Sequence, residues 1–267
     1  MDFTLAQYAL LSLILFASSV LQGAVGFASG LFGIPLLMLT GVSLPEAVAM
    51  SLVASAIQNF IAAWKLRSQI DFRGTLRPSL IRLASLPVGV YALHLIGEQN
   101  KDLANQLVGV VVLAIVALQF LTNVPPQPRL HPAWEWLAFG VGGFLLGLCG
   151  MGGPPMVLWI LAHDWPMNRG RAFLYFIFAT GVPPQALLLW LAFGQPVLIA
   201  MLLGLALLPA VLLGLWLGLH LSRYISDRLL RHLSLALLVA IALGAIATPY
   251  LRLTLPLKIH SISSFQK

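Results

Sequence analysis

The sequence predicts an all-α integral membrane protein composed of two inverted-topology repeats. Charged residues make up only 9% of the 267 positions and 60% of the positions are apolar, whereas charged residues reach about 25% in soluble domains. Positions 3–45 contain no charged residue, a stretch longer than the roughly 20 residues that one transmembrane helix needs. A glycine-rich pattern in this apolar region also returns later in the chain. These observations together predict a multi-pass membrane protein with two related halves.

The glycine-rich pattern repeats at a constant offset of 117 residues, so that Gly23 is matched by Gly140. The matched residues are Gly23, Gly26, Phe27, Gly30 and Gly33 in the first copy and Gly140, Gly143, Phe144, Gly147 and Gly150 in the second. Proline follows both copies within a few residues, at Pro35 and at Pro154-Pro155. Glycine weakens a helix and proline breaks its hydrogen-bond ladder. Paired interruptions of this kind are typical of secondary transporters.

Each half contains five apolar segments. They cover 5–22, 26–42, 47–64, 78–96 and 103–122 in the first half, and 133–149, 153–163, 172–193, 196–219 and 229–250 in the second. We therefore expect a first transmembrane repeat over 1–122, a proline-rich linker over 123–132, a second repeat over 133–250 and a C-terminal tail over 251–267. Each repeat is expected to be a Gly/Pro-interrupted helix pair or hairpin followed by three transmembrane helices.

The basic residues predict the orientation, because cytoplasmic loops of membrane proteins are enriched in lysine and arginine. If each glycine-rich region makes two crossings or a hairpin, one side collects Lys65, Arg67, Arg73, Arg77, Arg82, Arg129, Arg169, Arg171, Arg223, Arg228 and Arg231. The other side keeps only Lys101, Arg252, Lys258 and Lys267. If each glycine-rich region crossed the membrane only once, the two sides would carry nine and six basic residues. This difference is too small to indicate an orientation. We therefore expect oppositely directed halves with both termini outside the cytoplasm.

Three stretches carry a resemblance to a known family. They are QGAVGFASGLFGIPLLMLTGVSLPEAVAMSL, the basic loop WKLRSQIDFRG and the second copy FGVGGFLLGLCGMGGPPMVLWI. This pattern resembles the TauE/SafE family of membrane transporters. The resemblance implies a cell-membrane permease for sulfite, organosulfonates or related sulfur-containing or organic anions. The second copy departs from the first, since Met151-Gly152-Gly153-Pro154-Pro155 stand where the first has Ile34-Pro35, so the two interruptions need not be equivalent.

A broken helix offers a physical route to anion binding. The amide groups at its new N-terminus carry roughly half a positive charge and bind anions without lysine or arginine. We expect the two interruptions to meet near the membrane midplane and to hold a small anionic substrate by alternating access. The glycine candidates for this site are Gly23, Gly26, Gly30, Gly33, Gly147, Gly150, Gly152 and Gly153. The alternative is a structural or assembly membrane protein, in which the glycines serve only close helix packing.

Polar side chains inside the predicted spans complete the candidate site. They are Gln22, Ser51, Ser55, Gln58, Asn59, Thr180 and Gln185. Ser51, Ser55 and Gln58 are expected on one helix face. Hydroxyl and amide donors suit a partly dehydrated sulfonate or carboxylate, and the alternative role for each residue is hydrogen bonding between helices.

Several other functions are excluded or disfavoured. All eight acidic residues fall at predicted span ends or in loops, which argues against a cation substrate. No HExxH, GxSxG or phosphate-binding Walker motif is present, and the single Cys149 lies in no Cys/His cluster. We therefore expect no enzyme activity, no cofactor, no metal and no nucleic acid partner. The expected partners are a small anion and the lipid bilayer, with a homo-oligomer left open.

Overall fold

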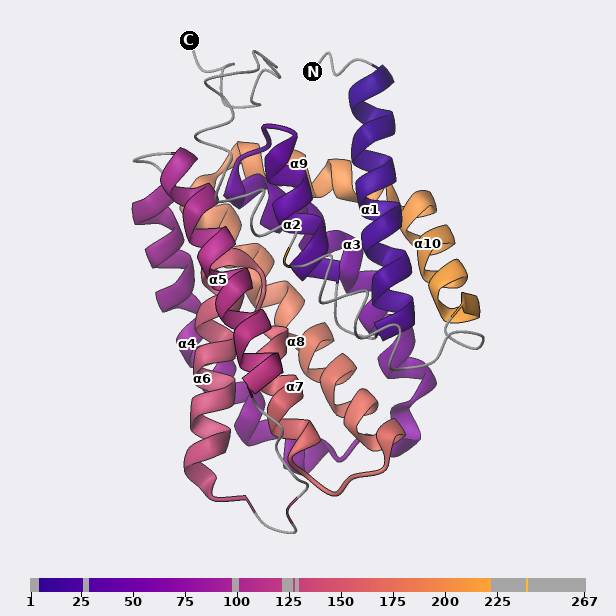
Figure 1. Cartoon of the computed structure of the whole chain (residues 1–267), viewed down its shortest axis with the longest axis vertical. Helices are drawn as coiled ribbons and strands as arrows, with labels where there is room; N and C mark the ends of the chain where they lie inside the picture. Colours follow the sequence, from indigo (N-terminus) through magenta and orange to yellow (C-terminus); the bar gives the residue numbers. More distant parts are fainter. Residues whose placement is uncertain are drawn as a thin grey trace.

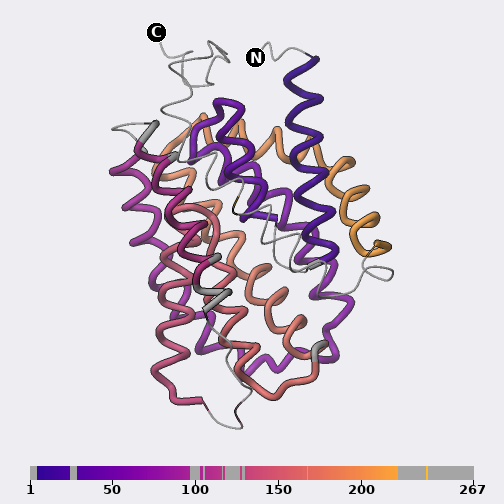
Figure 2. Tube along the Cα trace, viewed as in Figure 1, coloured from indigo at the N-terminus to yellow at the C-terminus, as the bar shows by residue number. Residues whose placement is uncertain are grey.

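The computed structural model describes residues 5–25, 29–97, 101–121, 127, 130–221 and 239, and Figure 2 draws the others in grey. The described chain is helical, apart from an isolated bridge between Gln127 and His163. The first-half helices are α1 (Leu5–Val25), α2 (Ser29–Leu39), α3 (Leu44–Lys65), η1 (Arg67–Gln69), α4 (Phe72–Gly97) and α5 (Lys101–Leu121). The second-half helices are α6 (Pro132–Cys149), α7 (Gly153–Leu161), α8 (Met167–Phe193), α9 (Gln195–Ala206) and α10 (Leu208–Leu221).

Five of these helices, α1, α3, α4, α6 and α8, are long and apolar enough to cross a membrane. A sixth candidate is the pair α9 and α10, which is bent by 55°. Pro209 at the start of α10 cannot donate a backbone hydrogen bond and accounts for the bend. The prediction of an all-α membrane protein is therefore confirmed. The segment expected over 196–219 therefore consists of two helices joined at this bend.

The predicted helix interruptions are present in both halves. α1 stops at Val25 and α2 starts at Ser29, while α6 stops at Cys149 and α7 starts at Gly153. Neither α2, with 11 residues, nor α7, with 9, is long enough to cross a membrane alone. The fifth segment of the second half, apart from residue 239, and the C-terminal tail lie outside the described residues.

Two long helix seams join the halves. α1 packs along α10, and α4 packs along α6. Glycine permits both contacts, since a Cβ built on Gly23 would lie 2.7 Å from the Leu215 carbonyl oxygen and one on Gly147 would lie 2.7 Å from the Val90 amide nitrogen. Each seam thus joins the first helix of one half to the fourth segment of the other. Figure 1 shows α1 running downward and α6 running upward.

α3 occupies the centre of the bundle and contacts α2, α8 and α9. Its N-terminus is capped, because the Ser43 amide and hydroxyl donate to Glu46 Oε2 at 3.0 and 2.6 Å. Glu46 is therefore buried but serves the helix end, as expected for an acidic residue at a span boundary. α3 presents one face to the place where the two interruptions meet.

The end of α3 and the starts of α4, α6 and α8 gather at one end of the bundle, the lower end in Figure 1. Arg77 Nε lies 3.4 Å from Glu135 Oε1, and Arg169 Nη2 lies 3.6 Å from Asp71 Oδ2. These ion pairs link α4 to α6 and α8 to the segment before α4. The sequence analysis placed the fourth apolar segment at 78–96, but α4 begins earlier, at Phe72, so Arg77 belongs to this helix.

Candidate functional site

The interruption between α6 and α7 leaves a helix N-terminus without a side-chain cap. Gly150 ends α6 in the left-handed conformation, with φ 71°, and its amide donates to the Leu146 carbonyl at 3.0 Å. L-residues rarely adopt this φ, so glycine suits the position. Gly152 is the N-cap of α7 and has no side chain to accept from the first amides of the helix. Of the first three residues of α7, Gly153 alone carries an amide N–H, because Pro154 and Pro155 have none. The Gly153 amide, at the positive end of the helix, is therefore the backbone donor that α7 offers to a ligand.

The interruption between α1 and α2 is arranged differently. The amide of Ser29, the first residue of α2, donates to Gln22 Oε1 of α1 at 2.9 Å. Gln22 therefore accepts a hydrogen bond from an amide at the N-terminus of α2. The accepting oxygen is uncharged and belongs to the same half of the chain. Gly26, a predicted site residue, lies outside the described residues.

The two interruptions touch each other. A Cβ built on Gly30 would lie 2.9 Å from the Gly150 carbonyl oxygen, and one built on Gly150 would lie 2.6 Å from Ile34 Cδ1. A cavity of about 70 Å³ lies beside this contact and borders on α1, α2, α3, α4, α6, α7 and α8. The sequence therefore brings both interruptions to one polar cavity.

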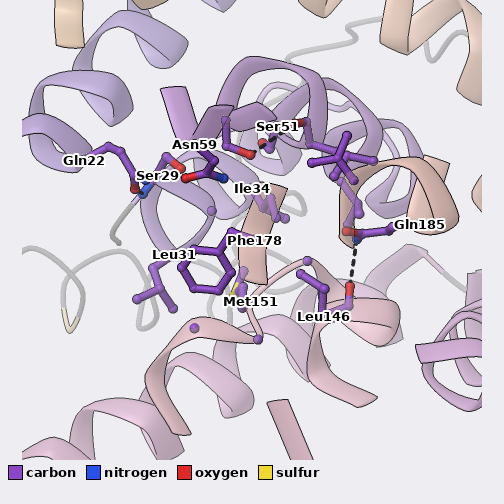
Figure 3. Close-up of a pocket in the computed structure, with 18 of the residues that line it drawn as sticks. Gln22, Ser29, Leu31, Ile34, Ser51, Asn59, Leu146, Met151, Phe178 and Gln185 are labelled. Carbon is purple, nitrogen blue, oxygen red and sulfur yellow. Dashed lines mark hydrogen bonds between the residues drawn. The ribbon is translucent and has the colours of Figure 1, made fainter. Parts of the chain in front are cut away.

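Nine of the predicted site residues line this cavity. They are Gln22, Gly30, Ser51, Ser55, Asn59, Gly150, Gly152, Gly153 and Gln185. In Figure 3, Asn59 points toward Gln22 and Ser29, while Gln185 on the other side bonds to Leu146, with its Nε2 donating to the carbonyl at 3.0 Å. Ser51 Oγ and Asn59 Oδ1 are buried and have no hydrogen-bond partner in the described structure.

The other predicted residues that the structure describes do not line the cavity. Gly23 and Gly147 lie in the two helix seams, and Gly33 faces the hydroxyl groups of Ser18 and Ser51. Gln58 turns away, since its Nε2 donates to Ser19 Oγ of α1 at 2.8 Å. Thr180 is exposed on α8 and donates to the Ile177 carbonyl at 3.0 Å. Glycine positions therefore divide between close packing and the cavity wall.

Arg82 is the cavity residue that the sequence analysis missed. It was counted among the basic residues of one membrane side, but this assignment is wrong, because α4 carries it into the protein interior, where it is only 1% exposed. It lines the cavity, and its Nε and Nη1 atoms have no hydrogen-bond partner in the described structure. Its position inside the predicted segment 78–96 was the available signal, because an arginine within a membrane span is uncommon and usually functional.

Helix α8 makes room for the Arg82 side chain. A Cβ at Gly181 would overlap the guanidinium group, so only glycine leaves space there. Pro183 and Pro184 cannot donate to the Ala179 and Thr180 carbonyls one turn earlier. Carbonyl oxygens that lack intrahelical donors favour a nearby cation. The guanidinium group thus lies against the backbone of α8 at Gly181.

The cavity combines positive charge with neutral hydrogen-bonding groups. Arg82 is charged, and no aspartate or glutamate is present among the described residues that line the cavity. The N-terminus of α7 adds the partial positive charge of a helix dipole. Groups of histidine, cysteine, aspartate or glutamate that could hold a metal ion do not occur in the part of the chain that the structure describes. This chemistry suits a small anion.

Comparison with known proteins agrees with the resemblance in the glycine pattern. The family model described as sulfite exporter TauE/SafE matches residues 10–259, a range that includes both interruptions and Arg82. No curated protein and no solved structure matches the chain. The chain belongs to the TauE/SafE sulfite exporter family of membrane transporters.

Proposed function

We propose that this protein is a secondary permease for small anions, with sulfite, organosulfonates or related organic anions as substrates. The observation that carries the proposal is Arg82, a fully buried guanidinium group with two unpartnered nitrogen atoms in a polar cavity. An unpaired charge buried in a membrane protein is costly and usually marks a transport pathway. A substrate anion would pair with Arg82 and accept a hydrogen bond from the Gly153 amide at the start of α7.

The substrate would reach the cavity by alternating access between two inverted halves. The opposite directions of α1 and α6 and the reciprocal seams α1–α10 and α4–α6 support this arrangement. Both halves contribute to the cavity wall, so a relative movement of the halves would open the cavity to one side at a time. Because the sequence has no Walker motif, an ion or substrate gradient would supply the energy.

The structural or assembly alternative is less favoured. In that case the glycines would serve only helix packing, as Gly23 and Gly147 do in the two seams. Packing does not account for a buried arginine or for interrupted helices around a polar cavity. Irregular backbone inside a membrane protein is tolerated chiefly where it lines such a cavity or is buried in protein.

A transport assay tests the proposal. The purified protein would be reconstituted into liposomes and supplied with radiolabelled sulfite, sulfoacetate or a small carboxylate, with and without a pH gradient. At least one anion is expected to cross faster than in protein-free liposomes, while a small organic cation is not. Absence of anion movement under both conditions would contradict the proposed function.

The proposed orientation in the cell membrane places both termini outside and η1 in the cytoplasm. The described basic residues that support it gather at one end of the bundle and include Lys65, Arg67, Arg73, Arg77, Arg169 and Arg171. We expect Gln195→Cys, in a Cys149→Ser background, to react with an impermeant thiol reagent in intact cells. Ser68→Cys should react only after permeabilisation, and the opposite pattern would reverse the orientation.

A further inference from the structure

A second groove lies on the outer surface of the bundle, between α4 and α6. It has a volume of about 420 Å³, and its lining includes Arg73, Leu76, Arg77, Leu80, Ala84 and Trp136. Leu76, Leu80 and Trp136 are each more than half exposed, at 62%, 58% and 56%. In a membrane-spanning helix such side chains face lipid. The groove shares no lining residue with the central cavity.

The polar end of this groove carries excess positive charge. Arg73 and Arg77 lie one turn apart on α4, near the starts of both helices. Arg77 lies beside Glu135 and over the Trp136 ring, with 5.8 Å from Cζ to the ring centroid. Arg73 forms no ion pair with any described residue. The groove lining therefore contains two guanidinium groups, and Glu135 pairs with that of Arg77.

The length of the groove suits one acyl chain. From Arg73 to Ala84 the helix rises about 16 Å, at 1.5 Å per residue. This distance is about half of the roughly 30 Å hydrocarbon thickness of a bilayer, which is the depth of one leaflet. The arginines lie at the end of α4, where lipid headgroups are expected, and the apolar residues extend toward the bilayer centre.

We propose that this groove binds one anionic phospholipid of the surrounding leaflet. The phosphate is held by Arg73 and Arg77, since guanidinium groups bind phosphate through paired hydrogen bonds. One acyl chain lies along Leu76, Leu80 and Ala84, with Trp136 beside the headgroup region. Basic pockets between transmembrane helices bind anionic headgroups in this way. This binding does not depend on the identity of the transported anion.

Native mass spectrometry of the full-length protein in detergent tests the proposal. Phosphatidylglycerol and phosphatidylethanolamine with identical acyl chains would be added at equal concentrations, and phosphatidylglycerol should be retained more strongly. Arg73→Gln should lower its retention about five-fold, which corresponds to roughly 1 kcal/mol for one basic residue. Ala84→Phe, which fills the apolar part of the groove without changing charge, should lower retention as well.

Arg67→Gln is the matched control. Arg67 lies at the same end of the bundle and stacks on Trp64, with 4.8 Å from Cζ to the ring centroid, but it does not line the groove. The Arg67→Gln variant should retain phosphatidylglycerol as strongly as the wild type. An equal loss in Arg67→Gln, equal retention of the two lipids, or full displacement by soluble glycerol phosphate would overturn the proposal. Arg73 and Ala84 are exposed, so folding of both variants is expected and is checked by size-exclusion chromatography.

Discussion

The two helix interruptions share a glycine framework but differ in how their helix N-termini are used. At the start of α2, the Ser29 amide is bonded to Gln22. At the start of α7, no side chain caps the helix, and Gly150 turns the chain in a left-handed conformation. The first interruption thus has one amide bonded to a side chain, whereas the second has no side-chain cap. Because Pro154 and Pro155 have no N–H, Gly153 supplies the amide that α7 offers to a ligand. Related sequence repeats can therefore contribute unlike parts to one site.

The side chains of the cavity show the same difference. Ser51, Asn59 and Arg82, which have buried atoms without partners, all come from the first half. The segment of the second half that corresponds to α4 is α9 with α10, and it contains no lysine or arginine. The first half therefore supplies charge and polar side chains, while the second supplies the uncapped start of α7 at Gly153 and the Gln185 side chain. A relative movement of the halves would separate these two sets of contacts.

The largest expected effect comes from Gly150→Ala. The substitution places a Cβ at φ 71° and 2.6 Å from Ile34 Cδ1, which should cost about 2–4 kcal/mol of folding stability. Gly140→Ala is the matched control, because a Cβ there meets nothing within 4 Å. Thermal unfolding followed by fluorescence size-exclusion chromatography should show a clear loss for Gly150→Ala only. Equal stability of the two variants would show that the second interruption does not require glycine.

Gln22→Glu should have the next largest effect. Glutamate can still accept the bond from the Ser29 amide, but it adds a negative charge to the cavity wall. Repulsion should raise the KM for the transported anion about ten-fold or more, equivalent to roughly 1.4 kcal/mol. Gln22→Met is the uncharged control and should cost about 1 kcal/mol of stability with little change in KM. If both variants transport with wild-type KM, the anion does not approach the first interruption.

Ser51→Ala should have a smaller effect. The Ser51 hydroxyl is buried at the cavity without a partner, so its loss should raise KM by about five-fold for a hydrogen bond of roughly 1 kcal/mol. Ser55→Ala should change KM less, because the Ser55 hydroxyl already donates to the Leu52 carbonyl at 3.1 Å. Thr180→Val, on the exposed face of α8, should leave transport unchanged. A larger change in Thr180→Val than in Ser51→Ala would place the substrate elsewhere.

Features that depend on local sequence were predicted well. The length of the apolar segments and the spacing of glycine and proline determine where helices form and break. The second interruption falls at 150–152 as expected, whereas α1 runs three residues past its expected end at 22. Ser51, Ser55 and Asn59 recur every fourth residue along α3, which brings them to one cavity wall. Gln58 was expected on the face of Ser51 and Ser55, but it bonds to Ser19 of α1, a partner that the pattern on α3 alone does not reveal.

Features that depend on distant helices were missed. Burial of Arg82 requires the space that Gly181 leaves on α8, almost one hundred residues further along the chain. Hydropathy alone also gave no sign that Pro209 would divide the last described span. Side-chain partners between helices require the three-dimensional arrangement.

Anion binding to Arg82 variants tests the central claim most directly. Equilibrium binding of radiolabelled sulfite to the purified protein would be compared among the wild type, Arg82→Gln, Arg82→Lys and the surface control Arg67→Gln. Arg82→Gln removes a buried charge and should fold, yet its affinity for sulfite should fall at least about 100-fold, or roughly 2.7 kcal/mol. Arg82→Lys should retain part of the affinity, since it keeps the charge without the paired donors, and Arg67→Gln should bind normally. Wild-type sulfite affinity in folded Arg82→Gln would contradict the account.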